Sequence, residues 1–204
     1  MRANNVYVLG LTGGICCGKS EAARLLRQLG AYHIDADAIS RALTAPGGEA
    51  LPAIRQIFGD EVFREDGSLN RQALGDLVFG DPAQKRALEG ILHPLVQRNM
   101  LRMLDEADQG EAKVALLDVP LLFETGMDAL CDEVWVMSAR RENQIRRIMA
   151  RDGLNQQQAE ARVDSQMDPE EREKRAGRVI SSEKPLDKMQ AEITGLYQQL
   201  LKKL

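Results

Sequence analysis

Short apolar runs alternate with amphipathic stretches along this chain. The run Val6–Leu9 is brief and rich in β-branched residues, which predicts a buried strand. Runs of the same kind predict four further strands, at Ala31–Ile34, Val114–Asp118, Val134–Met137 and Val179–Ile180. Strands that alternate with helical patterns are typical of α/β proteins, in which helices cover both faces of a parallel sheet. We therefore predict a three-layer α/β/α fold.

A helical pattern follows the first predicted strand. Its apolar residues recur at helical spacing, and Gly30 lies where a C-terminal cap is expected. The apolar stripe consists of Ala22, Ala23, Leu25, Leu26 and Leu29. The chain therefore opens with a strand, a glycine-rich loop and a helix.

The middle of the chain, residues 44–110, has a helical pattern that is interrupted by turns. Asn70 is placed to cap a helix that runs through Phe79. Pro94 predicts a break between two further helices, Pro82–Leu92 and Pro94–Asp108. Together these features predict an all-helical insertion between the second and third strands.

Residues 140–178 are polar and rich in arginine. Asn155 with Gln158 has the pattern of a capping box, and Asp168 begins a second such pattern, so two short helices are expected. Their thin apolar stripes favour a mobile lid over a core element. We expect three parts: a core (1–43, 111–145 and 176–204), the helical insertion (44–110) and the lid (146–175).

Composition narrows the class of protein. The 204 residues carry a net charge of −4, whereas general nucleic-acid binding relies on a basic surface, so we expect no nucleic-acid partner. No apolar run approaches the roughly 18 residues of a membrane span, and we expect no membrane association. The three cysteines, Cys16, Cys17 and Cys131, have no framework spacing, which indicates reduced thiols and a cytoplasmic location.

The stretch from Gly13 to Ser20 fits the pattern G-x-x-x-x-G-K-S/T. Glycines let such a loop turn its backbone N–H groups toward phosphate oxygens, and the N-terminus of the following helix favours the same anion. In this pattern Lys19 reaches the β- and γ-phosphates of a nucleotide, and Ser20 holds a magnesium ion. We expect nucleotide contacts at Gly13, Gly14, Ile15, Cys16, Cys17, Gly18, Lys19, Ser20 and Glu21.

Two adjacent cysteines in this loop leave two interpretations open. Cys16 and Cys17 supply the backbone N–H groups that the loop needs, so they are explained as tolerated small residues. The alternative is a redox-sensitive nucleotide site, because a helix N-terminus and Lys19 would both lower the pKa of a nearby thiol.

Carboxylates follow two of the predicted strands. Asp35 and Asp37 lie at the carboxyl end of the second strand, where open α/β sheets bind ligands, and in an extended Asp-x-Asp both side chains point the same way. One would accept a proton from an attacking hydroxyl group, and the other would orient that base or hold magnesium through water. Capping of a helix at Ala38–Leu43 is the alternative. Asp118 ends the third strand and suits water-mediated magnesium binding, although any strand-ending aspartate has the same appearance.

Arginines are concentrated after the fourth predicted strand. Arg147 and Arg151 are four residues apart and share a helix face, while Ile145, Ile148 and Met149 are expected on the buried side. The local positive charge suits a transferring phosphoryl group, and a solvated charged face is the alternative.

The two histidines, His33 and His93, have no companion at metal-ligand spacing. His93 precedes Pro94 and is explained either as a helix-boundary residue or as a substrate-binding residue. The sequence contains no Cys/His pattern of a zinc site.

Taken together, these residues resemble the dephospho-CoA kinase family, and the resemblance covers nearly the whole chain. The similar motifs are "GLTGGICCGKS" at 10–20, "IDADAISR" at 34–41, "FGDEVFREDGSLNRQAL" at 58–74, "VFGDPAQKRALEGILHPLV" at 78–96, "DVPLLFETGM" at 118–127 and "IRRIMARDGL" at 145–154. The resemblance implies a P-loop NTPase-like core for the nucleotide, a helical lobe that holds the CoA end of the substrate, and a lid.

The resemblance also implies a reaction, which is transfer of the γ-phosphoryl group of ATP to the ribose 3′-hydroxyl of dephospho-CoA, the last step of coenzyme A synthesis. It makes Asp37 the general base, and it makes Arg147 the lid arginine that closes over the transferring group while Lys19 holds the phosphates. Arg151 would assist Arg147 on the ATP side. Substrate contacts are expected at Asp35, Arg41 and His93, of which Arg41 matches a family position near the acceptor.

The chain departs from the family pattern at two places. The family usually has glycine and a small residue where this chain has Cys16 and Cys17, which would disturb the loop if the position requires a positive φ. It also tends to have asparagine and glycine after the last strand, where this chain has Ser181-Ser182-Glu183.

Two other functions stay open at this point. One is a different small-molecule or nucleoside monophosphate kinase on the same fold, in which only the acceptor pocket would differ. The other is a nucleotide-dependent switch. Two observations count against it: the sequence has no guanine-binding signature Asn-Lys-x-Asp, and a switch would leave Asp37 without a role. The sequence leaves the oligomeric state open.

Overall fold

The computed structural model describes residues 6–204. Contacts between residues divide the chain into two units, one formed by Met1–Ile34 with Glu106–Leu204 and the other by Asp35–Asp105. The division into core, insertion and lid that we expect from the sequence stays a prediction.

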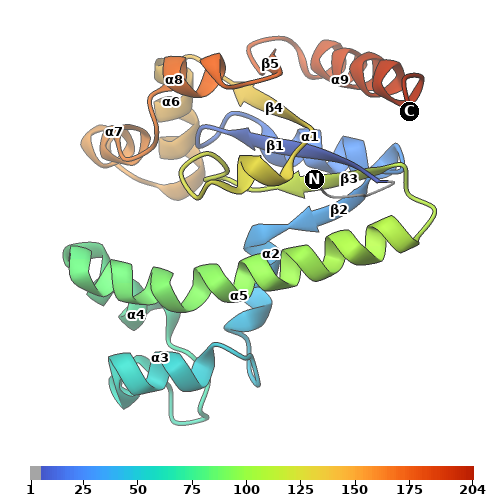
Figure 1. Ribbon diagram of the computed structural model, residues 1–204. Helices are drawn as coiled ribbons and strands as arrows, with labels where there is room; N and C mark the ends of the chain where they lie inside the picture. The colour runs from blue at the N-terminus through green and yellow to red at the C-terminus, as the bar shows by residue number, and fades with distance from the viewer. Residues whose placement is uncertain (1–5) are drawn as a thin grey trace. The chain divides into compact units, whose positions relative to one another are not determined.

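A five-stranded sheet, with the order β2-β3-β1-β4-β5, is the centre of the first unit (Figure 1). Its strands are β1 (Tyr7–Gly13), β2 (Tyr32–Asp35), β3 (Val114–Asp118), β4 (Glu133–Ser138) and β5 (Arg178–Ser181). β1 pairs in parallel with β3 and with β4, and β4 pairs in parallel with β5. The predicted α/β class and all five predicted strands are confirmed, and β1 extends four residues beyond the predicted run to reach Gly13.

Helix α1 (Lys19–Gln28) packs against the sheet and against the C-terminal helix α9 (Leu186–Leu201). Leu26 of α1 and Ile193 of α9 have no exposed surface, and they share a core cluster with Leu9 of β1. Burial of one such side chain contributes about 1.5–3 kcal/mol. Gly30 follows α1 with a φ of 100°, as the predicted C-terminal cap requires.

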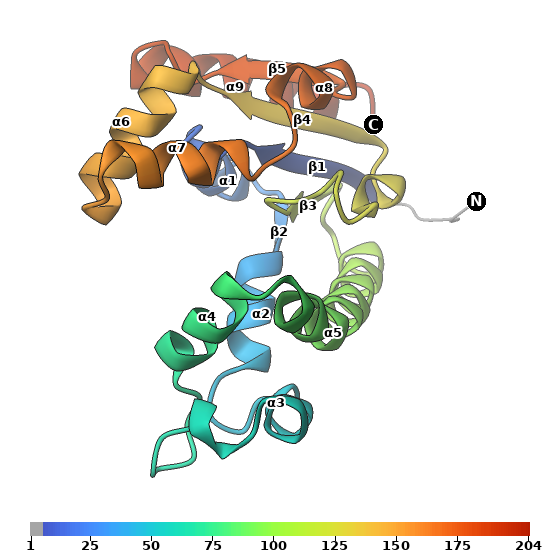
Figure 2. The ribbon, with the colours of Figure 1, turned by 90° about the vertical axis from the view of Figure 1, so that its left-hand side faces the viewer.

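Three helices, α6 (Arg141–Asp152), α7 (Gln156–Asp164) and α8 (Pro169–Lys174), follow β4, and α6 lies beside α7 (Figure 2). The predicted capping box at Asn155 is confirmed, because the Asn155 side chain accepts from the Gln158 N–H and the Gln158 side chain accepts from the Asn155 N–H. Asp168 caps α8, as expected. The expectation that Met149 is buried is wrong, because Met149 lies on the solvent face of α6 while Ile148 is buried.

The second unit contains α2 (Ala36–Leu43), α3 (Leu51–Phe58), the 3₁₀ turn η1 (Asp60–Val62), α4 (Arg71–Gly80) and most of α5 (Pro82–Gln109). Asn70 caps α4 by accepting from the Ala73 N–H at 3.2 Å, as predicted. The predicted break at Pro94 is wrong, because α5 continues through it (Figure 1). A proline removes one helical hydrogen bond, and the buried positions Met100 and Leu104 continue the apolar face beyond it.

Even α5, at 28 residues, is too polar to cross a bilayer, and the same holds for every helix among residues 6–204.

Candidate active site

The glycine-rich loop lies at the carboxyl end of β1, with β3 on one side of that strand and β4 on the other. The chain continues from β1 to β2 on one side of the sheet and reaches β4 on the opposite side, so the loop lies where the strand order reverses. Ligands of open α/β sheets bind in the crevice at such a point. The predicted strand-loop-helix context of the loop is confirmed.

At two positions of the loop the backbone geometry requires glycine. Gly18 precedes α1 with a φ of 82°, which is the left-handed conformation that favours glycine. A Cβ atom on Gly13 would lie 2.5 Å from the backbone oxygen of Met137, so a side chain there would displace β4. The loop geometry therefore depends on both residues.

Cys16 also has a left-handed backbone, with a φ of 58°, and it is the one non-glycine residue with a positive φ between 6 and 204. This conformation costs an L-residue with a side chain about 1–2 kcal/mol. The position at which the family usually has glycine therefore does take a positive φ in this chain.

The expectation that the loop lowers the pKa of its thiols is wrong. Burial raises the pKa of the Cys17 thiol to about 11, and the Arg172 guanidinium and the Gln144 hydrogen bond only partly oppose this effect. Burial also raises the pKa of Cys16, against the opposing charge of Arg151. Desolvation disfavours the thiolate more strongly than the nearby positive groups favour it. The raised pKa values disfavour the redox interpretation.

Two glutamines hold the backbone of Ile15, and sequence reasoning missed both. Gln144 of α6 is buried, and its Nε2 donates to the Ile15 carbonyl oxygen at 3.0 Å. The Ile15 N–H donates to Oε1 of Gln166, which lies between α7 and α8, at 2.8 Å. A glutamine four residues before Ile148, on the buried face of α6, is the only signal that the sequence offers.

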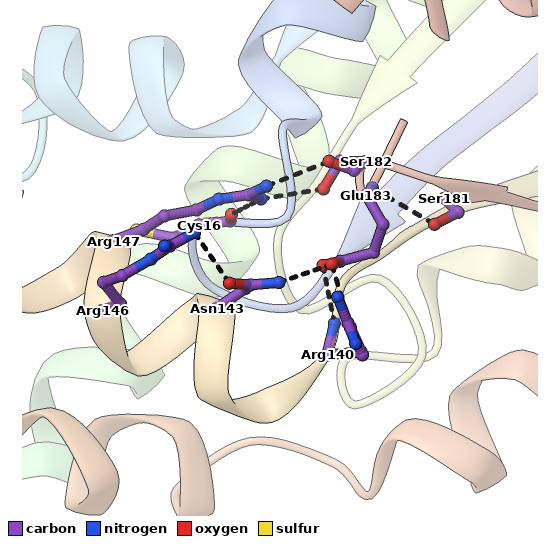
Figure 3. Close-up of polar contacts among 8 residues, drawn as sticks. All are labelled: Cys16, Arg140, Asn143, Arg146, Arg147, Ser181, Ser182 and Glu183. Atoms are coloured by element: carbon purple, nitrogen blue, oxygen red, sulfur yellow. Dashed lines mark hydrogen bonds and ion pairs between the residues drawn. The ribbon is translucent and has the colours of Figure 1, made fainter. Parts of the chain in front are cut away.

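Arg147 of α6 bridges the loop and the segment that follows β5 (Figure 3). Its Nη1 donates to the Cys16 carbonyl oxygen at 3.0 Å and to the Ser182 hydroxyl at 2.9 Å, and its Nη2 donates to the Ser182 carbonyl oxygen at 3.0 Å. The guanidinium group is thereby fixed next to the predicted nucleotide loop.

Glu183 fixes the first turn of α6 in the same view (Figure 3). Its carboxylate accepts from the Arg140 N–H at 3.0 Å, from Arg140 Nε at 3.1 Å and from Asn143 Nδ2 at 2.5 Å. The backbone N–H of Arg140 is the main reason that the pKa of Glu183 is lowered. The departures from the family pattern at Ser182 and Glu183 therefore attach α6 to the end of β5.

Arg151 does not behave like Arg147. It is exposed, and it donates to both oxygens of Asp152, at 2.7 and 2.9 Å. Arg162 donates to the same carboxylate at 2.6 Å. Of the two arginines, Arg147 contacts the loop, while Arg151 belongs to an exposed charge cluster.

One cluster of side chains consists of Lys19 at the start of α1, Asp118 at the end of β3 and His33 within β2. Lys19 Nζ lies 2.5 Å from Asp118 Oδ1, and His33 Nε2 lies 3.1 Å from Asp118 Oδ2. Burial by itself raises the pKa of Asp118, but the hydrogen bonds from His33 and Lys19 outweigh it, and the net pKa is lowered. An ionised carboxylate only accepts hydrogen bonds, so the His33 Nε2 atom carries the proton.

The residues around Lys19 fit a magnesium ion chemically. The Ser20 side chain is exposed at the start of α1, and the Asp118 carboxylate lies at the end of β3. Mg²⁺ prefers oxygen ligands and keeps several waters, which suits a hydroxyl group with a carboxylate that acts through water. Glu21 has other partners, because it accepts from Arg24 and from Gln190.

The Asp-x-Asp motif crosses from a strand into a helix. β2 ends at Asp35 and α2 begins at Ala36, so the fully extended geometry that we expected is wrong. Asp35 caps α2 by accepting from the Ala38 N–H at 2.9 Å. Asp37 is exposed in the first turn of α2.

The two other predicted substrate residues lie in the same unit as Asp37. The Arg41 guanidinium lies 3.6 Å from the Asp35 carboxylate. His93 is exposed within α5, so its interpretation as a helix-boundary residue is wrong, while its role in substrate binding stays a prediction.

Comparisons with known proteins agree with this geometry. The family model of dephospho-CoA kinase matches residues 7–187. A dephospho-CoA kinase from Symbiobacterium thermophilum is 44% identical over 190 residues, which are 93% of this chain and 80% of the relative. The solved dephospho-CoA kinase from Campylobacter jejuni is 28% identical and has a TM-score of 0.67, with 94% of this chain and 96% of that chain covered. A shikimate kinase from Bacteroides thetaiotaomicron shares the fold, at 16% identity and a TM-score of 0.52, with 96% of this chain and 98% of that chain covered. The chain belongs to the dephospho-CoA kinase family and is a P-loop kinase.

Proposed function

We propose that this chain transfers the γ-phosphoryl group of ATP to the ribose 3′-hydroxyl of dephospho-CoA, giving coenzyme A and ADP. The observation that carries this proposal is the glycine loop at the carboxyl end of β1, in a chain whose family membership spans residues 7–187. Both substrates are small molecules. The family membership and the free cysteines favour a location in the cytoplasm, where thiols stay reduced.

The first set of residues binds ATP. The N–H groups of the loop and the Lys19 ammonium group hold the phosphates, and Ser20 holds magnesium with Asp118 acting through water. When bound, magnesium neutralises charge on the phosphate oxygens. Arg147 approaches the transferring group from the side of Cys16, whose carbonyl oxygen it already contacts, and Arg151 assists it from the next turn.

Asp37 accepts the proton of the attacking hydroxyl group. General-base assistance contributes about 10²–10⁴-fold to a rate, so Asp37→Asn should lower kcat by that factor. Asp66→Asn is the matched control, because it makes the same change at an exposed carboxylate of the same unit, and asparagine can still accept from the Ser68 N–H. If Asp37→Asn turned over within threefold of the wild type, Asp37 would not be the base.

A coupled assay of ADP release tests the reaction itself. Parallel reactions receive dephospho-CoA, a panel of nucleoside monophosphates, or no acceptor. We expect turnover with dephospho-CoA alone. Turnover with a nucleoside monophosphate instead would indicate a different kinase, and equal ADP release without an acceptor would indicate a nucleotide-hydrolysing switch.

A further inference from the structure

The Asp118 carboxylate has two partners of different kinds. Lys19, at the start of α1, contacts Oδ1, and His33, on β2, contacts Oδ2. The side chain of Asp118 is only 6% exposed, while those of Lys19 and His33 are 16% and 18% exposed. A carboxylate this deeply buried needs hydrogen-bond partners, because an ion left without them keeps its full desolvation penalty.

The two partners of Asp118 differ in their proposed contact with ATP. Lys19 is the residue that binds phosphate in the proposed function, and its flexible stem with a point charge allows it to change partners. His33 lies on β2, and the proposed function gives it no contact with ATP. When Lys19 turns toward the phosphates, Asp118 loses the Lys19 contact, and His33 remains as its side-chain donor.

We infer that His33 is a positioning residue, which keeps Asp118 hydrogen-bonded and oriented while Lys19 moves to the phosphates of ATP. The inference rests on the proposed function, because it requires that Lys19 binds ATP. Without the His33 donor, Asp118 would hold Lys19 more tightly, and once Lys19 departs it would depend on the waters around magnesium alone. Both effects penalise the nucleotide-bound state, whereas a purely structural role of His33 would affect the free and the bound protein equally.

The experiment is calorimetric titration of the full chain with ATP and magnesium. We compare the wild type with His33→Val, which keeps a residue suited to a strand but offers no donor, and with His33→Gln, whose amide N–H replaces the donor. We expect His33→Val to raise the Kd of ATP about tenfold, which corresponds to about 1.4 kcal/mol. His33→Gln should stay within about threefold of the wild type, since a hydrogen bond is retained. His33→Ala serves as the donor-free variant if circular dichroism shows that His33→Val is unfolded.

A double-mutant cycle separates positioning from general destabilisation. In an Asp118→Asn background the buried charge is absent, so adding His33→Val should change the Kd of ATP by less than about twofold. The rise in Tm that saturating ATP produces should also be smaller for His33→Val than for the wild type.

The outcomes are distinguishable from a failure of the proposed function. Wild-type protein that binds ATP while His33→Val binds it equally well would overturn the inference alone. The inference alone would also be overturned if His33→Val weakened ATP binding tenfold in the Asp118→Asn background. Wild-type protein that fails to bind ATP would overturn the proposed function, and the inference with it.

Discussion

At the scale of single residues, one residue of the glycine-rich loop, Cys16, has a backbone conformation that is unfavourable for a residue with a side chain. Cys16 has a φ of 58° in the segment that connects β1 to α1. The surrounding contacts stabilise this backbone, because Arg147 holds the Cys16 carbonyl oxygen and two glutamines hold the carbonyl oxygen and the N–H of Ile15. Strain of this kind is typical of functional loops.

The effect of a substitution at Cys16 on the free energy of unfolding should depend on how well the new residue tolerates a positive φ. Cys16→Gly removes the strain but frees the unfolded chain, so we expect it to raise the free energy of unfolding by about 0.5–1 kcal/mol. Cys16→Val places a β-branched residue at positive φ, and we expect a loss of about 1–2 kcal/mol. Urea denaturation measures both values. A valine variant as stable as the glycine variant would contradict the assigned conformation.

The thiols of the loop should be slow nucleophiles in the folded protein. With a pKa of about 11, the Cys17 thiol is ionised in about one molecule in ten thousand at pH 7, against about one in a hundred for an unperturbed thiol. Because the pKa is raised, the thiolate fraction and the alkylation rate should increase with pH well beyond pH 9. Mass spectrometry after timed treatment with iodoacetamide measures this rate at each pH.

The same chain in urea is the control, since unfolding removes the burial that raises the pKa. Alkylation of Cys17 at pH 7 should then be faster than in the folded state. Equal rates in the folded and unfolded protein would contradict the burial effect and would restore the redox interpretation.

At the scale of elements, helix caps were predictable from the sequence, whereas contacts between residues far apart in sequence were not. The cap of α4 at Asn70 and the capping box at Asn155 were predicted correctly, because a cap involves residues three apart in sequence. The continuity of α5 through Pro94 was not predicted, because packing further along the helix outweighs one lost hydrogen bond.

The site contains contacts that local patterns cannot reveal. His33 and Asp118 are 85 residues apart in sequence, and Gln144 contacts Ile15 across 129 residues. Arg147 meets Ser182 only because α6 packs near the end of β5. Periodicity predicted the strands that carry His33 and Asp118, but the sheet order that makes these two residues neighbours follows from the whole chain. The loop and its lysine were predictable because their motif is continuous in sequence.

The capping box of α7 gives a prediction at this scale. Asn155→Ala removes the acceptor for the Gln158 N–H, and we expect the first turn of α7 to lose about 1 kcal/mol of stability. Hydrogen exchange of the amides at the start of α7 measures the loss. Asn155→Asp is the control, because aspartate caps equally well, and unchanged protection in the alanine variant would contradict the assigned cap.

At the scale of the whole molecule, the fold and the substrate rest on different observations. The alternation of strands and helices predicts an α/β protein, and the glycine loop predicts a nucleotide. Neither selects the acceptor, because P-loop kinases with different acceptors share the fold, as the likeness to a shikimate kinase shows. The acceptor comes from motifs distributed along the chain, which the family match over residues 7–187 bears out.

The most direct test of the central claim is identification of the product. The full chain is incubated with ATP, magnesium and dephospho-CoA, and the product is analysed by tandem mass spectrometry and phosphorus NMR. We predict one new phosphate on the ribose 3′-oxygen and one ADP for each coenzyme A formed. Release of inorganic phosphate without a phosphorylated acceptor, or a phosphate on another oxygen, would contradict the account.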